Sequence, residues 1–286
     1  MNSKFNKDSK ILIVGLGLIG GSYAEALTDK GYYVGAVARR KETIDYAIDR
    51  GLIKSGVTEV DKEYISDFDI IVFALYPNVF IDWIRENQDC IKKGALLTDV
   101  TGVKGSVVYK VQDALREDLE FIGAHPMAGK EVYGVENSDK SIFKCANYIV
   151  TPTDKNTQEA IDACCELGRE LGFKTVTSLS PETHDEMIGF LSQLTHCIAV
   201  SLMCANGDPN LVRYTGDSFR DLTRIAKIND SMWSELFMLN KDELLSQMEL
   251  FIDKFKELKS TIENDDREKM REMMRLSTQR RKYFDK

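Results

Sequence analysis

Histidine is scarce in this sequence, with three residues among 286, so each one is a candidate for a chemical role. The six cysteines form no C-x-x-C pair. Zinc sites and redox motifs use that spacing, so we expect reduced thiols and no metal site. We identify no apolar run near the roughly 18 residues of a membrane span and no apolar core of a secretion signal in the first ten residues. These absences predict a cytoplasmic protein that does not enter a membrane.

The charge is one-sided: 46 Asp and Glu against 38 Lys and Arg give a net charge of −8. An acidic surface repels a phosphate backbone, so we expect no nucleic-acid partner. A small anionic ligand would need arginines placed close to it, because the overall field repels it too. The length allows one large domain or two of ordinary size.

Short apolar runs alternate with helical patterns through the first part of the chain. The runs that predict strands are residues 10–14, 32–38, 69–77, 95–100, 120–126, 147–152 and 173–179. Amphipathic stretches separate several of them, including residues 41–51, 77–87, 103–117 and 156–172. This alternation predicts an α/β Rossmann domain over residues 1–179, with a doubly wound, mostly parallel sheet.

The pattern changes at Ser180, which suits a helix N-cap, and Pro181 suits the first helical position. From there to residue 286 the sequence predicts helices only, beginning with one long helix over 180–207. Their wide apolar stripes need burial. We therefore predict an all-α domain over 180–286 that forms a homodimer through intertwined C-terminal helices. A helical bundle closed on itself is the alternative.

Gly15, Gly17 and Gly20 follow the first predicted strand in the spacing G-x-G-x-x-G. The first glycine allows a tight turn and the second lets the backbone approach a pyrophosphate. The third lets the next helix pack against the strand. Because the loop joins a strand to a helix, it predicts dinucleotide binding, with Leu18 and Ile19 in the same loop.

The end of the second strand bears on the choice of dinucleotide. NAD enzymes usually carry Asp or Glu there to bind the ribose hydroxyls, but this sequence has Ala38 followed by Arg39 and Arg40. Arginine binds a 2′-phosphate through charge-assisted hydrogen bonds. We predict a preference for NADP; the alternative is that both arginines are solvated and NAD binds.

His125 lies at the end of the predicted strand 120–126, on the carboxyl edge of the sheet where ligands bind in this architecture. A histidine beside a nicotinamide can accept a hydroxyl proton while the carbon loses hydride. We predict that role for His125. The alternatives are a buried structural histidine and a metal ligand.

Two further clusters carry polar groups. Ser192 and His196 lie seven and eleven residues after Asp185, which places the three on one face of an ideal helix. A satisfied core histidine is the alternative for His196. We expect His184 to point elsewhere and to cap or solvate the helix start. Arg220 and Arg224 are four residues apart and share a face of a short predicted helix. They form either a salt-bridged surface or a carboxylate clamp.

Five segments together resemble the prephenate dehydrogenase family, which has arogenate dehydrogenases as close relatives. The segments are GLGLIGGS, TDVTGVKGSVV, GAHPMAGKEVYGVENSDKSIF, SPETHDEMIGFLSQLTHCIAVSL and FRDLTRIAKINDSMW. They follow the family's order and spacing over nearly the whole chain, and HPMAG with TRIA is a specific combination. The resemblance implies oxidative decarboxylation of prephenate to 4-hydroxyphenylpyruvate and CO₂ in tyrosine biosynthesis, with arogenate as the alternative substrate.

The resemblance also implies roles for single residues. His125 matches the catalytic histidine that contacts the ring hydroxyl, His196 a histidine near the substrate side chain, and Arg224 an arginine that holds a substrate carboxylate. Charged positions around the mouth of the site match Glu131, Arg220 and Asp221. Of these, Arg220 is expected to reach in from a partner subunit.

Two departures from the family pattern concern this site. Gly102 stands where the family commonly has a serine beside the catalytic histidine, so that hydrogen bond is absent or comes from Thr101. Gln193 replaces the first histidine of the commoner motif SHLPH. An acid facing the substrate side chain would favour arogenate, and Asp185 is the candidate.

Other interpretations remain at this stage. A non-catalytic NAD(P)-binding regulator is supported by Gly102 alone. A general hydroxyacid or imine reductase of similar architecture would not be expected to carry both HPMAG and TRIA. Because the sequence ends at Lys286, we expect no regulatory domain after the helices and no tyrosine inhibition through one.

Overall fold

The computed structural model describes residues 4–285 and forms two compact units, Met1–Asn240 and Lys241–Lys286. The first unit contains an eight-stranded sheet in the order β3-β2-β1-β4-β5-β6-β7-β8. Neighbouring strands are parallel except β6 and β7. The predicted doubly wound, mostly parallel sheet is therefore confirmed. Its strands are β1 (Lys10–Val14), β2 (Tyr33–Val37), β3 (Ser55–Val57), β4 (Ile70–Phe73), β5 (Leu96–Asp99), β6 (Glu120–Pro126), β7 (Asn147–Thr151) and β8 (Thr175–Ser178).

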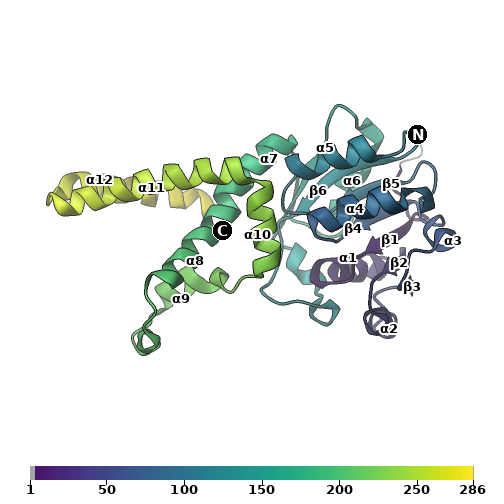
Figure 1. Ribbon diagram of the computed structural model, residues 1–286, viewed down its shortest axis with the longest axis horizontal. Helices are drawn as coiled ribbons and strands as arrows, with labels where there is room; N and C mark the ends of the chain where they lie inside the picture. The colour runs from purple at the N-terminus through teal and green to yellow at the C-terminus, as the bar shows by residue number, and fades with distance from the viewer. Residues whose placement is uncertain (1–3, 286) are drawn as a thin grey trace. The chain divides into compact units, whose positions relative to one another are not determined.

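Helices cover both faces of the sheet (Figure 1). Side chains alternate along β1: Ile11 and Ile13 pack with α1, α2 and α6, whereas Leu12 and Val14 pack with α3, α4 and α5. A parallel strand covered on both faces must be apolar throughout, which explains the unbroken run in β1. These helices are α1 (Leu18–Asp29), α2 (Lys41–Asp49), α3 (Lys62–Ile65), α4 (Pro77–Asn87), α5 (Gly105–Ala114) and α6 (Gln158–Glu170).

The described chain after β8 is helical, as predicted. Ser180 caps the first of these helices, because its Oγ accepts a hydrogen bond from the Thr183 N–H at 3.2 Å. The predicted long helix runs from Pro181 to Ala205 and contains a π-helical segment, Gly189–Leu194, between α7 (Pro181–Ile188) and α8 (Thr195–Ala205). The first unit continues with α9 (Asp217–Thr223) and α10 (Asp230–Leu239). The second unit contains α11 (Lys241–Glu263) and α12 (Arg267–Arg281).

The helix Pro181–Ala205 corrects one expectation. By length and composition it is apolar enough to cross a membrane, whereas the sequence analysis identified no run of that size. The expectation failed because scattered polar residues interrupt the apolar run, although the mean hydropathy of the helix stays at 1.6. Only 28% of its most apolar 18-residue stretch is buried, so most of that stretch is not covered by the rest of the chain.

Candidate active site

The glycine loop after β1 has the geometry that a dinucleotide requires. Gly15 has φ +100°, and a Cβ there would lie 2.4 Å from the Ala74 carbonyl oxygen. A Cβ on Gly20 would lie 2.0 Å from the Gly15 carbonyl oxygen, so the helix packs tightly on the loop. A Cβ on Gly17, by contrast, would meet nothing within 4 Å. The open backbone at Gly17 and the start of α1, which no side chain caps, fit a pyrophosphate.

The two candidate arginines lie beside this loop. β2 ends at Val37, whose carbonyl accepts the Gly15 N–H at 2.9 Å. Arg39 and Arg40 follow it and are both exposed, and Arg40 is the N-cap residue of α2. In the described part of the chain neither arginine forms a salt bridge. The carboxyl end of β2 therefore presents two uncompensated cations where the ribose of a dinucleotide binds in this architecture.

His125 lies in β6, at the carboxyl edge of the sheet, and keeps partial exposure. Its Nδ1 is 2.9 Å from Nε2 of His184, and Nδ1 of His184 is 2.7 Å from Oδ1 of Asp185. His184 is fully buried. The expectation that His184 points away from the site is therefore wrong: its ring lies against His125, and both His184 and Asp185 are buried.

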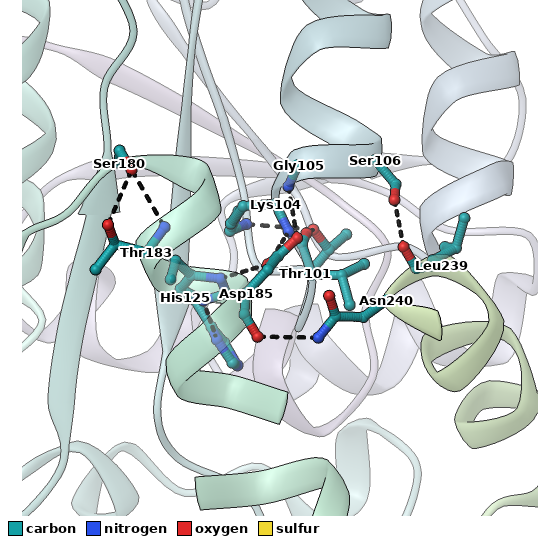
Figure 2. A network of polar contacts seen from close by, with 12 residues as sticks. Thr101, Lys104, Gly105, Ser106, His125, Ser180, Thr183, Asp185, Leu239 and Asn240 are labelled. Carbon is teal, nitrogen blue, oxygen red and sulfur yellow. Dashed lines mark hydrogen bonds and ion pairs between the residues drawn. The ribbon is translucent and has the colours of Figure 1, made fainter. Parts of the chain in front are cut away.

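The Asp185 carboxylate faces the start of α5 (Figure 2). Oδ1 accepts the Lys104 N–H and Oδ2 the Gly105 N–H, both at 2.8 Å. A carboxylate at a helix N-terminus satisfies amides that have no partner within the helix. Asp185 is only 5% exposed, so its two hydrogen bonds to the start of α5 are shielded from solvent.

Lys104 connects this carboxylate to a second one. Its Nζ, fully buried, lies 2.8 and 2.7 Å from the two carboxylate oxygens of Asp99. Oδ1 of Asp99 also accepts the N–H of Ala124 at 3.0 Å, the residue before His125. Burial lowers the pKa of Lys104, and the charge of Asp99 opposes that shift. The main chain of β6 and the ring of His125 are thus both anchored through Lys104.

Lowered pKa values favour the neutral form of both imidazoles near pH 7. Burial lowers the pKa of His125 well below its usual value, and the charges of His184 and Lys104 act in the same direction. Burial also lowers the pKa of His184, although its hydrogen bond to Asp185 opposes the change. A neutral histidine at the ligand-binding edge of the sheet can accept a proton.

Gly102 and Thr101 lie on the loop between β5 and α5. A Cβ on Gly102 would be 3.8 Å from Nε2 of His125 and 3.6 Å from Cδ1 of Leu236, both ordinary van der Waals distances, so this ring nitrogen lies directly beside Gly102. Thr101 is buried, and its hydroxyl contacts Asp99, the Val103 carbonyl and Lys104. Thr101 therefore uses its hydroxyl within the buried network rather than in place of a serine at Gly102.

A second group of polar side chains surrounds His196 in α8. Its Nδ1–H donates to the Ser192 carbonyl at 2.9 Å, and its ring stacks on Trp233 with the centroids 3.7 Å apart. Burial lowers the pKa of His196. The positive charge of Arg224 lowers this pKa further, whereas the negative charge of Glu131 raises it. Arg224 forms an ion pair with Glu131, which is 93 residues away in sequence. The structure thus brings together three predicted substrate-binding residues.

Arg220 and Asp221 are placed differently. Both are exposed on α9, and Arg220 pairs with Asp217 on its own helix. Arg224 begins a 3-10 turn after α9. The two arginines therefore bind different carboxylates, Asp217 for Arg220 and Glu131 for Arg224.

Two functional positions escaped the sequence analysis, His184 and Asn240. The Asn240 side chain donates to the Asp185 carbonyl at 3.0 Å and to Oε1 of Gln193 at 2.8 Å. Gln193 in turn donates to the Leu236 carbonyl at 3.1 Å. These bonds fix α7 against the end of α10. The adjacent His and Asp at 184 and 185 were the available signal, because such a pair can orient a second histidine.

A glycine-rich nucleotide loop, a histidine at the carboxyl edge of the same sheet and an attached helical region define a two-part nicotinamide-nucleotide dehydrogenase. Two family models locate the chain within that class. The prephenate dehydrogenase nucleotide-binding domain matches residues 23–177, and the prephenate dehydrogenase dimerization domain matches residues 180–276. The chain belongs to the prephenate dehydrogenase family.

Individual relatives agree with the family models. The chain is 28% identical to prephenate dehydrogenase from Bacillus subtilis over 91% of its length and 72% of that protein. It is 30% identical to prephenate dehydrogenase from Lactococcus lactis, over 85% of this chain and 68% of the relative. The crystal structure of the A. aeolicus enzyme in complex with hydroxyphenyl propionate and NAD+ superposes with a TM-score of 0.88 at 30% identity. That comparison covers 97% of this chain and 98% of the other.

Proposed function

We propose that this chain catalyses the oxidative decarboxylation of prephenate to 4-hydroxyphenylpyruvate, with His125 as the base. The observation that carries the proposal is the position of His125. Its Nε2 lies beside Gly102 on the carboxyl edge of the sheet, while its Nδ1 is hydrogen-bonded to His184. A hydroxyl placed there can donate its proton to a neutral imidazole.

The nicotinamide of the bound cofactor supplies the hydride acceptor. His125 Nε2 takes the proton of the ring hydroxyl as the hydride leaves the same carbon, which gives a ketone. The ring carboxylate then leaves as CO₂, and its bonding electrons make the ring aromatic and its oxygen a phenolate. The phenolate recovers the proton from His125. The base therefore holds the proton only between the two steps, and the net reaction releases none.

Substrate carboxylates need local cations in this acidic protein. We assign the side-chain carboxylate to Arg224, next to His196, with Glu131 holding the guanidinium in place until substrate binds. Thr101 and Gly102 shape the wall beside the ring hydroxyl. The remaining residues predicted at the mouth, Arg220 and Asp221, are exposed, and we assign Arg220 to the site of a second subunit.

Prephenate is favoured over arogenate by the state of Asp185. The sequence offered this carboxylate as a partner for the amino group of arogenate. In the structure its oxygens accept two N–H groups from the start of α5 and lie against His184. A carboxylate occupied in this way has no free oxygen directed at a substrate ammonium.

We further propose NADP as the preferred cofactor, with the pyrophosphate at Gly15, Gly17 and Gly20 and the neighbouring Leu18 and Ile19. Arg39 and Arg40 would bind the 2′-phosphate, because both are exposed without a salt-bridge partner in the described chain. The 1–179 segment then acts as the nucleotide-binding domain and the 180–286 segment as the substrate and dimerisation domain.

A homodimer accounts for the uncovered face of the helix Pro181–Ala205. Phe190 and Leu191 are 54% and 49% exposed on it, and exposed apolar patches of this kind mark contact surfaces. The same helix carries His184, Asp185 and Gln193 in contacts with the sheet and α10. A membrane would have to displace those contacts, so a second copy in the cytoplasm is the better cover.

The test is the absorbance of the reduced nicotinamide with the purified full chain. Prephenate and arogenate are each offered with NAD and with NADP. Fastest reduction with prephenate and NADP is the expected result. Faster turnover of arogenate would overturn the substrate assignment, faster reduction of NAD the cofactor assignment, and no reduction in any mixture the enzymatic role itself.

A further inference from the structure

We propose that His184 and Asp185 form a positioning dyad that holds the ring of His125 with its proton on Nδ1 and its lone pair on Nε2. The inference deepens the proposed function, because it rests on His125 being the base. His184 and Asp185 touch neither substrate nor cofactor in this scheme. They act through His125.

The hydrogen-bond sequence fixes the protons. A carboxylate can only accept, so His184 Nδ1 carries a proton and donates it to Asp185 at 2.7 Å. In a neutral ring, Nε2 of His184 is then an acceptor. The 2.9 Å contact to His125 requires the proton on Nδ1 of His125. The remaining nitrogen of His125, Nε2, which lies beside Gly102, is left with a lone pair.

The far end of the dyad is fixed as well. The Lys104 and Gly105 N–H groups hold both oxygens of Asp185, so its carboxylate cannot rotate to release His184 without leaving two amides unpaired. The other charged groups facing the two rings are Lys104 and Asp99. They form their own ion pair, so Asp185 is the carboxylate that is hydrogen-bonded to His184.

The dyad has a chemical consequence when His125 accepts the substrate proton. The resulting imidazolium donates from Nδ1 to His184, and His184 donates to the Asp185 anion. Positive charge on a buried ring is thereby paired with a negative charge through one intervening imidazole. A purely structural role would require only packing and would be indifferent to which nitrogen of His125 carries the proton.

The low histidine content permits a direct test that does not depend on turnover. With three histidines in the chain, imidazole ¹⁵N spectra of the ¹⁵N-histidine-labelled full protein near neutral pH can be assigned by single substitutions. We expect His125 to show a protonated Nδ1 and an unprotonated Nε2. In His184→Leu, which removes the acceptor, the proton of His125 moves to Nε2. In His184→Gln, whose amide oxygen can accept, it stays on Nδ1.

Kinetics provide the second arm. His184→Leu is expected to lower kcat by roughly 100-fold, within the usual contribution of acid–base catalysis, with substrate KM changed less than about threefold. His184→Gln, which keeps a hydrogen-bond acceptor, is expected to have a kcat between those of His184→Leu and wild type. Asp185→Asn lowers kcat, whereas Glu186→Gln removes a carboxylate from the exposed neighbouring position and leaves kcat unchanged. Circular dichroism confirms that each variant is folded.

A wild-type His125 with its proton on Nε2 would overturn the dyad, even if the variants fail to fold. Equal kcat for His184→Leu and wild type would overturn it as well. The expected tautomer in a protein that reduces no cofactor with either substrate would leave the dyad standing and refute the proposed function instead. The two inferences therefore fail separately.

Discussion

Replacing Gly17 and Gly20 of the loop, one at a time, by alanine should separate folding from cofactor binding. The Cβ of Gly17→Ala meets no atom within 4 Å, and its φ of −112° is allowed for alanine. We expect it to cost less than ~1 kcal/mol, the difference between Gly and Ala at a helix N-cap. The methyl group would occupy the space proposed for the pyrophosphate, so NADP affinity should fall at least tenfold, about 1.4 kcal/mol.

Gly20→Ala should behave in the opposite way. Its methyl group would lie 2.0 Å from the Gly15 carbonyl oxygen and 3.1 Å from the Ala74 Cβ. Both contacts involve atoms that cannot rotate away, so β1 and α1 must separate. Overpacking of this kind costs roughly 1–3 kcal/mol. For a unit of this size that corresponds to a decrease in Tm of about 2–12 °C.

Thermal unfolding without cofactor and NADP titration by fluorescence measure the two effects on the same samples. Gly207→Ala is the matched control, because its Cβ also meets nothing within 4 Å and lies away from the loop in sequence. If Gly17→Ala binds NADP as wild type does, the pyrophosphate does not cross Gly17. If Gly20→Ala is as stable as Gly17→Ala, the close approach of helix and loop is not a constraint.

Further predictions concern charge, pH and assembly. Arg39→Ala should weaken NADP by roughly 10- to 100-fold, the range for a hydrogen bond to a charged group, and leave NAD unchanged; equal losses for both cofactors would refute the 2′-phosphate assignment. The base must be neutral, and burial lowers the pKa of His125. The acid limb of kcat/KM should therefore lie below pH 6.5 (that pKa's usual value), and a limb above it would contradict this. Arg224→Ala should raise KM for prephenate by roughly 10- to 100-fold, and a change in kcat alone would argue against a carboxylate clamp. Leu191→Asp should dissociate the homodimer in sedimentation, and an unchanged mass would place the interface elsewhere.

The ends of helices could be predicted where a proline or a capping residue marks them in the sequence. The predicted helix 77–87 has the observed bounds of α4, because Pro77 fixes its first turn. Ser180 caps α7 as expected. The short strand β3 and helix α3 were not predicted, since three and four residues are too few to show a period.

The active site was predictable only where one segment carries the signal. His125 and the glycine loop each lie in such a segment. His184 was misplaced because an ideal helix turns it about 100° away from Asp185, whereas in the structure both residues are buried. The pairing of Glu131 with Arg224 spans 93 residues and leaves no local trace. The π-helical segment before α8 also shifts the helical phase that the projection assumed.

The support of the base crosses the boundary between the two family domains. His125 lies in the part matched by the nucleotide-binding model, whereas His184 and Asp185 lie in the part matched by the dimerization model. A nucleotide-binding domain produced alone, or grafted onto another helical partner, would keep its glycine loop but lose the groups that orient its histidine. If His125 is the base, as proposed, the first domain can bind the cofactor by itself, while the base is held in its working orientation only in the joined chain.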